Sequence, residues 1–422
     1  MLDIKFIREN IELVKENIRN KNEKADLSEF LDLEEKRRLI IKEVEKLKND
    51  RNNASKEIAQ LKKDGKDATE YINEMKFVSD KIKELDDELR IIEDKIFTTI
   101  SYLPNILHES VPIGKSAEDN AIIRCFGEIK EQKFKANHIE ISKNLGILDF
   151  ERGAKVSGSG FAFYVGKGAA LERALIRFML DYHIEKHGYT EIWSPFMVNP
   201  ESMFATGQLP KMADDMYYID ADDMYLIPTA EVPLTNYHRD DILKIEDLPK
   251  KICGYSPCFR RESGSYGKDV HGFLRVHQFN KVEMVNFTLP EKSYEQLEIL
   301  VSEAEDILKA LEIPYRVVLL CSGDTSFSSA KTYDLEIWAS GEQKWLEVSS
   351  CSNFADFQAR RGNIRFKRTP NSKPEFVHTL NGSGLATSRL YASILENYIQ
   401  EDGSVVVPEV LRDYCKFDKI DK

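Results

Sequence analysis

The strongest constraint in this chain is a pair of apolar seams whose residues recur at alternating steps of three and four. This spacing lines apolar side chains along one stripe of a long helix and is typical of a coiled coil. A polar stretch at 62–70, with Gly65 inside it, separates the two seams. We therefore expect an antiparallel helical hairpin over about 30–103, with its tip at 62–70. The seam residues are Phe30, Leu33, Ile40, Val44, Leu47, Ala54, Ile58 and Leu61, followed by Tyr71, Met75, Val78, Ile82, Leu85, Leu89, Ile92 and Ile96.

The hairpin must project from its domain, because two helices of thirty-odd residues are each roughly 45–50 Å long. Pro104 and Pro112 end the helical pattern. We therefore expect an N-terminal domain at 1–105 and a second domain at 106–422. Heptads alone assign no chemistry, since many coiled coils only dimerise or act as spacers. The first helix and the tip, KKDGK, are rich in lysine and arginine, which is the local charge that RNA phosphates require.

Composition limits the class of protein. The chain has 422 residues, of which 42% are apolar and 31% charged, as in ordinary folded proteins. No stretch approaches twenty consecutive apolar residues, and MLDIKFIREN does not resemble a signal peptide. We expect a cytoplasmic protein that does not interact with a membrane. The six scattered cysteines favour reduced thiols over a zinc site or disulfides. The net charge of -12 argues against a chain that coats nucleic acid indiscriminately.

The pattern changes beyond residue 120 to short apolar runs separated by glycine, proline and polar turns. Consecutive strands without helical crossovers predict an antiparallel sheet with flanking helices, which is an α+β domain. The expected strands are 224–228, 252–262, 274–285, 315–320, 333–338 and 345–350, and the expected helices are 169–187, 294–311 and 386–400.

One predicted hairpin carries an unusual set of side chains on one face. Its two strands flank a glycine-bearing loop at 263–272. Alternation places two of these side chains together on the first strand and three together on the second. Such charges are costly to bury unless a partner completes them, and a nucleotide would do so through its phosphates and its adenine ring. A solvated face with cross-strand salt bridges explains the pattern equally well. The residues are Arg260 and Glu262, then Arg275, Phe279 and Glu283.

A glycine-bearing strand end, LNGSGLATSR, favours the nucleotide. It precedes a predicted helix that has Arg389 in its first turn. The backbone could approach a ligand closely at Gly382 and Gly384, and the helix N-terminus with its arginine offers positive charge to phosphate. The chain has no GxxxxGK[ST] loop and no GxGxxG between a strand and a helix, so a nucleotide must be held differently.

The segment WLEVSSCSN supplies Glu347 and Ser350, oxygen ligands suited to Mg²⁺ on a triphosphate. Strict alternation would place these two side chains on opposite faces of a strand. They can cooperate only if the strand ends or bulges between them.

Together these segments resemble the three signature motifs of class II aminoacyl-tRNA synthetases. GYTEIWSPFMV is similar to the first motif, CFRRESGSYGKDVHGFLRVHQFNKVEMV to the second, and GSGLATSR to the third. Neither HIGH nor KMSKS, the signatures of the other synthetase class, occurs. Within the class the chain resembles the seryl-tRNA synthetase family, essentially from Met1 to the C-terminus. That resemblance rests on TGQLPK at 206–211, IPTAEVPL at 227–234, EVSSCSNFADFQARR at 347–361 and LNGSGLA at 380–386.

The resemblance implies a class II catalytic domain, built on an antiparallel sheet of six or seven strands, with the N-terminal coiled-coil arm attached. It implies a homodimer that uses ATP and Mg²⁺ to convert L-serine to seryl-adenylate. The serine is then transferred to the 3′ end of tRNA(Ser), which the arm binds. In this family tRNA(Sec) is a second acceptor in bacteria that have one.

Residue roles follow from the resemblance where the residues match. The implied catalytic residues, which hold phosphates, are Arg260, Arg275 and Arg389. The implied ATP-binding residues are these three with Arg261, Glu262, Phe279, Glu347, Val348, Ser349 and Ser350, of which Glu347 and Ser350 would bind the metal. The implied serine-binding residues are Thr229, Ala230, Glu231, Arg260, Glu283 and Ser383, of which Glu283 and Ser383 would read the hydroxyl.

Two other functions compete with this interpretation. A related ligase that loads an amino acid onto a carrier protein would lack the arm at 30–103. A non-catalytic RNA-binding paralogue would have lost charged residues of the site, whereas this chain retains Arg260, Glu262, Arg275, Glu283, Glu347 and Arg389.

Overall fold

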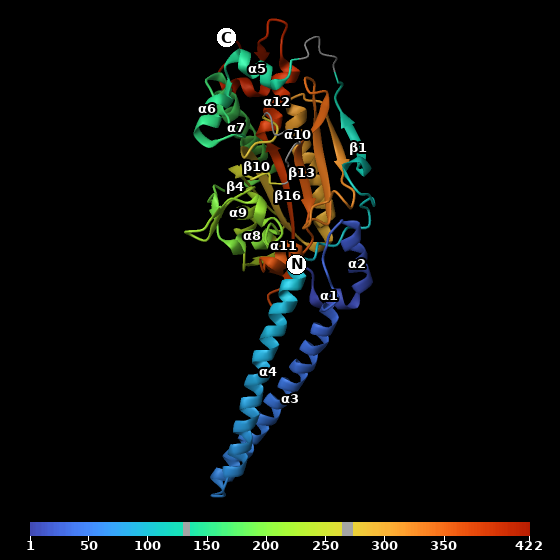
Figure 1. The fold of residues 1–422 in the computed structure, drawn as a ribbon, viewed down its shortest axis with the longest axis vertical. Coiled ribbons are helices and arrows are strands. Elements are labelled where there is room, and N and C mark those ends of the chain that lie inside the picture. Colours follow the sequence, from blue (N-terminus) through green and yellow to red (C-terminus); the bar gives the residue numbers. More distant parts are fainter. Residues whose placement is uncertain (130–135, 264–272) are drawn as a thin grey trace. The chain divides into compact units, whose positions relative to one another are not determined.

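The chain folds into two units in the computed structural model, which describes residues 1–129, 136–263 and 273–422 (Figure 1). One unit comprises Leu2–Arg19 and Glu23–Leu103. The other comprises Pro104–Lys422 together with Met1 and Asn20–Asn22. The glycine-bearing loop expected at 263–272 lies outside the described residues, apart from Ser263.

The first unit contains the predicted helical hairpin. Two short helices, α1 (Ile4–Glu9) and α2 (Ile11–Asn20), precede the long helices α3 (Phe30–Lys63) and α4 (Thr69–Ser101). Ion pairs link the long helices in antiparallel order, with Arg37 Nε 2.9 Å from Glu93 Oε1 and Lys48 Nζ 3.3 Å from Asp86 Oδ2. The sequence prediction of an antiparallel helical arm is confirmed.

The apolar seam of the hairpin is buried most fully away from its tip. Buried seam residues are Phe30, Ile40 and Val44 in α3 and Ile82, Leu85, Ile92 and Ile96 in α4. Nearer the tip the seam residues are half-exposed, and Tyr71, expected in the seam, is exposed. Two helices alone cannot enclose a seam from every side, so the heptad pattern overstated burial at the tip.

The second unit is built on an eight-stranded sheet of order β1-β11-β12-β13-β16-β10-β9-β4. Neighbouring strands are antiparallel except for β4 and β9, which run parallel. The α+β prediction is confirmed, with one strand more than the resemblance implied. The strands are β1 (Ala121–Phe126), β11 (Tyr315–Leu319), β12 (Lys331–Ala339), β13 (Lys344–Asn353), β16 (His378–Ala386), β10 (Gln278–Thr288), β9 (Lys250–Phe259) and β4 (Thr190–Glu191).

Three helices, α7 (Lys167–His187), α10 (Ser293–Ala310) and α12 (Thr387–Tyr398), pack on the strands of this sheet and share its main hydrophobic core (Figure 1). Alternation along β10 separates two environments. Val282 and Met284 belong to the main core, whereas Val285 and Phe287 belong to a smaller core on the other face. The odd-numbered positions of β10 therefore face away from the three helices.

Smaller elements surround the sheet. The strand expected at 224–228 is shorter and lies in a separate three-stranded sheet with β5 and β6. No helix in the described ranges combines the length and apolarity needed to cross a membrane. The other α-helices of the described residues are α5 (His138–Leu145), α6 (Phe150–Ser157), α8 (Pro200–Thr206), α9 (Glu231–Asn236), α11 (Phe357–Arg361) and α13 (Glu409–Cys415). The remaining strands are β2 (Leu148–Asp149), β3 (Phe163–Tyr164), β5 (Met197–Val198), β6 (Tyr218–Ile219), β7 (Met224–Leu226), β8 (Ile242–Lys244), β14 (Arg365–Lys367), β15 (Glu375–Phe376), β17 (Val405–Val406) and β18 (Lys419–Ile420).

The hairpin of β9 and β10 is shorter than the sequence predicted. Its last paired residues are Phe259 and Gln278, so the arginine and glutamate that follow β9 do not belong to a strand. The amide of Arg261 donates to the carbonyl of Asp215 at 2.9 Å, which draws the chain out of the ladder. Glu262 then adopts a left-handed backbone with φ 52°. The prediction from alternation was therefore wrong for Arg260, Glu262 and Arg275, and it holds for Phe279 and Glu283.

Candidate active site

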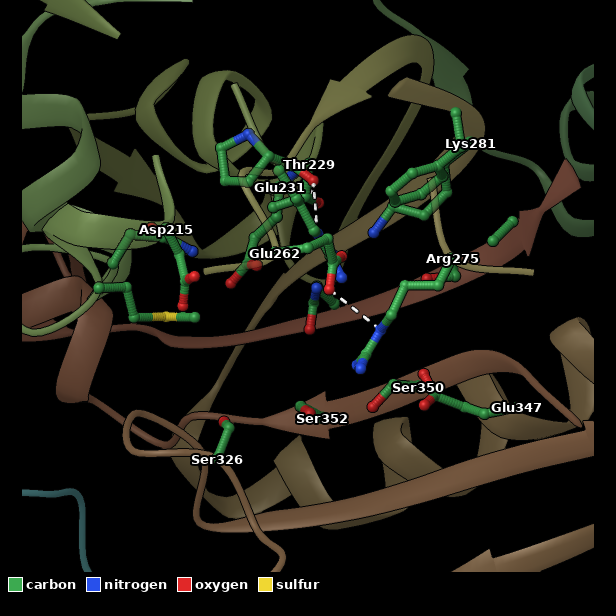
Figure 2. A pocket seen from close by; sticks show the side chains of 18 of the residues that line it. Asp215, Thr229, Glu231, Glu262, Arg275, Lys281, Ser326, Glu347, Ser350 and Ser352 are labelled. Atoms are coloured by element: carbon green, nitrogen blue, oxygen red, sulfur yellow. Dashed lines mark hydrogen bonds and ion pairs between the residues drawn. The ribbon is translucent and has the colours of Figure 1, made fainter. Parts of the chain in front are cut away.

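A cavity of about 650 Å³ opens over β10, β13 and β16 (Figure 2). Loops bring further residues to it from 207–231, from the end of β9 and from 274–276. Figure 2 shows Glu347, Ser350 and Ser352 along one strand, with Thr229 and Glu231 across the cavity from them. The predicted site residues that line it are Thr229, Glu231, Arg260, Glu262, Arg275, Phe279, Glu347, Val348, Ser350, Ser383 and Arg389.

Four predicted site residues do not line the cavity. Glu283 is fully buried and connects to it through hydrogen-bonded neighbours. Ser349 is also buried, and its hydroxyl donates to the carbonyl of Ser383 at 2.6 Å. Ala230 belongs to the smaller core. Arg261 is exposed and is held through its backbone amide. These four residues lie behind the lining of the cavity or contribute through their backbone. Among them, Glu283 is hydrogen-bonded directly to two lining residues, Thr229 and Asn381.

The arginines of the site are already held by carboxylates and a ring. The Arg275 Nε lies 3.0 Å from Glu262 Oε2. The Arg260 guanidinium lies 5.2 Å from the ring centroid of Phe279, a cation–π distance. Both cations line the cavity, where an anionic ligand could take the place of these partners.

Arg389 is anchored to β13 as the first turn of α12 begins. Its Nη1 donates to the carbonyl of Glu347 at 2.7 Å and lies 3.5 Å from that residue's Oε2. Its Nε donates to the carbonyl of Leu274 at 3.3 Å. The guanidinium thus joins the strand that carries the predicted metal ligands to the helix N-terminus.

A bulge brings Glu347 and Ser350 to one face of β13. Leu335 pairs with Ser349 whereas Glu336 pairs with Glu347, so Val348 is an extra residue in the strand. Such a bulge is what the sequence analysis required if Glu347 and Ser350 are to lie on the same face of the strand. Both now line the cavity.

The oxygen donors near this bulge fit a divalent cation. Asp334 pairs with Ser350 across β12 and β13. Burial, and then the charge of Glu347, raise the pKa of Asp334 well above its ordinary value. Its Oδ1 is buried without a hydrogen-bond partner among the described residues. A carboxylate pair with a hydroxyl is a hard-oxygen donor set of the kind Mg²⁺ prefers, and a cation there would offset the repulsion.

A buried polar cluster forms the floor of the cavity beside β10. The two oxygens of Glu283 accept hydrogen bonds from Thr229 Oγ1 and Asn381 Nδ2, each at 2.9 Å. Gln358 Nε2 donates to Glu231 Oε1 at 2.6 Å. Burial raises the pKa of Glu231 to about 7, and the charge of Glu283 adds to this rise. Two neighbouring carboxylates in a small buried space suit a ligand that brings a cation and a hydroxyl donor.

The glycines of the third motif serve packing. A Cβ at Gly382 would lie 2.9 Å from Cys351 Sγ, and one at Gly384 would lie 2.5 Å from His183 Nε2. His183 is buried in α7 and belongs to the helix side of the sheet. The expectation that these glycines allow a ligand to approach was therefore wrong; they allow α7 and α10 to approach β16.

Sequence reasoning missed several residues of the cavity. Lys281 could have been found, because it lies two positions from both Phe279 and Glu283 and alternation therefore places it on the same face. Asn381 and Gln358 could not be found, since only the pairing of β16 with β10 and the packing of α11 bring them to the floor.

The sheet, the arginines above it and the helix-bound third motif define a class II aminoacyl-tRNA synthetase core. Residues 216–398 match the tRNA synthetase class II core domain (G, H, P, S and T), and residues 1–107 match the Seryl-tRNA synthetase N-terminal domain. The chain belongs to the seryl-tRNA synthetase family.

Similar proteins cover the whole chain. The serine–tRNA ligase of Caldicellulosiruptor bescii is 58% identical over 421 residues, which is 100% of both chains. That of Chlorobium phaeobacteroides (strain DSM 266) is 54% identical over 429 residues, 100% of this chain and 99% of the other. The structure of seryl-tRNA synthetase from Pyrococcus horikoshii complexed with ATP matches with a TM-score of 0.92 and 41% identity over 100% of this chain and 99% of that one. The Naegleria fowleri enzyme in complex with AMP matches with a TM-score of 0.87 and 32% identity, covering 100% and 98%.

Proposed function

We propose that this protein activates L-serine with ATP to form seryl-adenylate and then transfers the serine to the 3′ end of tRNA(Ser). Where a tRNA(Sec) exists, it is a second acceptor. The observation that carries the substrate assignment is the buried floor of the cavity, where Glu283 and Glu231 lie beside Thr229. The full-length similarity to serine–tRNA ligases and the ATP-bound structural relative support the reaction.

The proposed chemistry needs alignment and charge neutralisation. The serine carboxylate attacks the α-phosphorus and pyrophosphate leaves. The carboxylate is already ionised, so this step requires no general base. Arg260 lines the cavity, and its charge acts on Glu231 of the floor. It would hold the serine carboxylate and the α-phosphate together. Arg275 and Arg389 would hold the outer phosphates.

Mg²⁺ would be held by Glu347 and Ser350, and when bound it supplies neutralising charge to the triphosphate. Phe279 offers its ring to adenine, and Glu262 offers a carboxylate to the exocyclic amine. The match of residues 1–107 favours tRNA over a carrier protein as the acceptor of serine. The family resemblance further supports a homodimer that works in the cytoplasm and binds tRNA(Ser) through the arm.

The direct test is ATP–pyrophosphate exchange with each of the standard amino acids in turn. We expect exchange with serine and at most a small fraction of that rate with alanine or threonine. Alanine leaves Glu283 without the hydroxyl that it should accept from, and threonine carries an additional methyl group. Stimulation mainly by another amino acid would overturn the substrate assignment.

The protonation of Glu231 should appear in the pH dependence of serine use. Because burial raises its pKa to about 7, the free enzyme gains a proton there as the pH falls through neutrality. The neutral acid attracts the serine ammonium less strongly than the carboxylate does. We expect kcat/KM for serine to fall roughly tenfold between about pH 8 and about pH 6, since this parameter reports the free enzyme.

The change of Glu231 to glutamine provides the control for this pH profile. It should lower kcat/KM for serine at high pH and leave the remaining activity insensitive to pH near neutrality. A wild-type profile that is flat across this range would assign the ammonium contact to another group.

A further inference from the structure

Lys281 is a buried lysine on the cavity face of β10. It is 6% exposed, and it lies between the ring proposed to stack on adenine, Phe279, and the fully buried Glu283. Its Nζ forms an ion pair with Glu283 Oε2, the oxygen that also accepts from Thr229. Figure 2 shows its side chain extending into the cavity. A lysine is rarely buried this deeply unless it is paired with a carboxylate.

The charge balance of the floor explains the lysine. Two buried carboxylates, Glu231 and Glu283, lie close enough for the charge of one to raise the pKa of the other. Lys281 from β10 and Arg260 beyond β9 act in the opposite direction. The titratable neighbour on β9 is the buried Cys258 thiol, whose pKa burial raises. Because Arg260 is proposed to hold the serine carboxylate and the α-phosphate, Lys281 is the cation that remains with the two carboxylates of the floor.

An ionised Glu283 can only accept hydrogen bonds, whereas a protonated one can also donate. With Lys281 in place, Glu283 is held as an acceptor by three donors: the lysine, Thr229 and Asn381. Once Glu231 is also ionised, two carboxylates stand against one lysine, and the serine ammonium would neutralise the remaining negative charge. Without the lysine the pair would take up a proton more readily than in the wild type, because two carboxylates in a buried site do not both ionise readily.

We propose that Lys281 is a specificity-determining residue for the amino acid: it keeps Glu283 an ionised acceptor, so that the pocket selects a ligand with both a hydroxyl and an ammonium group. This inference rests on the proposed function. Its consequence is that Lys281 contributes to the preference for serine over alanine, which differ only in the hydroxyl that Glu283 would accept.

The test compares Lys281→Met with the wild type in serine-dependent and alanine-dependent pyrophosphate exchange, at high alanine concentration. Methionine keeps most of the stem volume and removes the charge. We expect kcat/KM for serine to fall about 100-fold and that for alanine to fall no more than about tenfold, because alanine shares the ammonium but lacks the hydroxyl, with KM for ATP unchanged. Lys281→Arg, which retains the charge, should recover part of the serine preference.

Calorimetry of serine binding gives a readout that a structural role would not move. Near neutral pH, Lys281→Met should release more protons on binding serine than the wild type does, measured in buffers of different ionisation enthalpy. The reason is that the ammonium displaces the proton shared by Glu231 and Glu283.

Lys251→Met is the matched control. Lys251 lies on β9 of the same hairpin, pairs with the buried carboxylate of Glu303 and does not line the cavity. Its replacement should lower thermal stability and leave the ratio of serine to alanine use unchanged.

Equal losses with serine and alanine in Lys281→Met would show a structural role and overturn the proposal. An effect confined to KM for ATP or to kcat would indicate that the lysine contacts a phosphate group, and it would also overturn the proposal. Failure of the wild type to exchange with serine would instead refute the proposed function, so the two failures are distinguishable.

Discussion

Replacing Glu283 with alanine should abolish serine-dependent pyrophosphate exchange. The carboxylate is fully buried, accepts hydrogen bonds from Thr229 Oγ1 and Asn381 Nδ2 at 2.9 Å, and forms an ion pair with Lys281. Its loss removes the proposed acceptor for the serine hydroxyl and leaves a buried lysine without its partner. Both effects weaken the binding of serine in its transition state. We therefore expect kcat/KM for serine to fall by at least about 1,000-fold, which corresponds to a loss of about 4 kcal/mol of transition-state stabilisation.

The controls for Glu283→Ala separate chemistry from folding. Glu283→Gln keeps the size and one acceptor oxygen but loses the charge, and it should retain more activity than alanine does. Glu303 offers a matched buried carboxylate, since it pairs with Lys251 and accepts from Tyr189 Oη at 2.6 Å outside the cavity. Glu303→Ala should lower the melting temperature while KM for serine stays within about twofold. Unchanged exchange in a folded Glu283→Ala protein would refute the assignment of the serine pocket.

The helical arm was predictable because its signal is local. A period of three and four residues, interrupted by one polar stretch, places both helices within a few residues of α3 and α4. The exposure of Tyr71 shows the limit of that signal, since the number of elements that cover a helix does not appear in its own periodicity.

The site was predictable only where it depended on alternation within one strand. Phe279 and Glu283 share a face of β10 as expected, and Lys281 follows the same rule. Where β9 ends is decided by the amide of Arg261, which bonds to Asp215, forty-six positions earlier in the chain. Whether Glu347 and Ser350 share a face is decided by the register of β12 against β13. Both are tertiary contacts that a pattern within one segment does not contain.

The resemblance to a family supplied what local patterns could not. It brought Thr229 into one site with Ser383 and Arg389, which come from a second segment, and the structure places all three at one cavity. It did not explain the glycines of the third motif, whose reason is the packing of Gly384 against His183. A motif can therefore identify a site correctly even when one of its residues is required for packing on the opposite side of the sheet.

Deleting residues 40–92 and closing the stump with a short turn should leave serine activation intact and remove tRNA charging. The deletion begins just beyond the Arg37–Glu93 ion pair. The helical segments that remain therefore retain the buried apolar residues Phe30, Ile96 and Ile100 at the end of the hairpin away from its tip. The cavity lies wholly in the other unit, and exchange should stay within about twofold of the wild type. Charging of tRNA(Ser) should fall by more than about 100-fold, because phosphate contacts supply much of the affinity for RNA.

A charge variant that keeps the arm at full length distinguishes RNA binding from spacing. Lys62, Lys63 and Lys66 are exposed at the tip, and their joint replacement by glutamine leaves the hairpin and its length in place. If the tip binds RNA, KM for tRNA should rise and the dependence of log KM on log salt should become less steep by up to about three units, one for each lysine replaced. Wild-type charging in both the deletion and the charge variant would show that the hairpin is only a spacer. Impaired charging in the deletion alone would place the RNA-binding surface along the lysine-rich face of α3, because that face is removed with the hairpin and is intact in the tip variant.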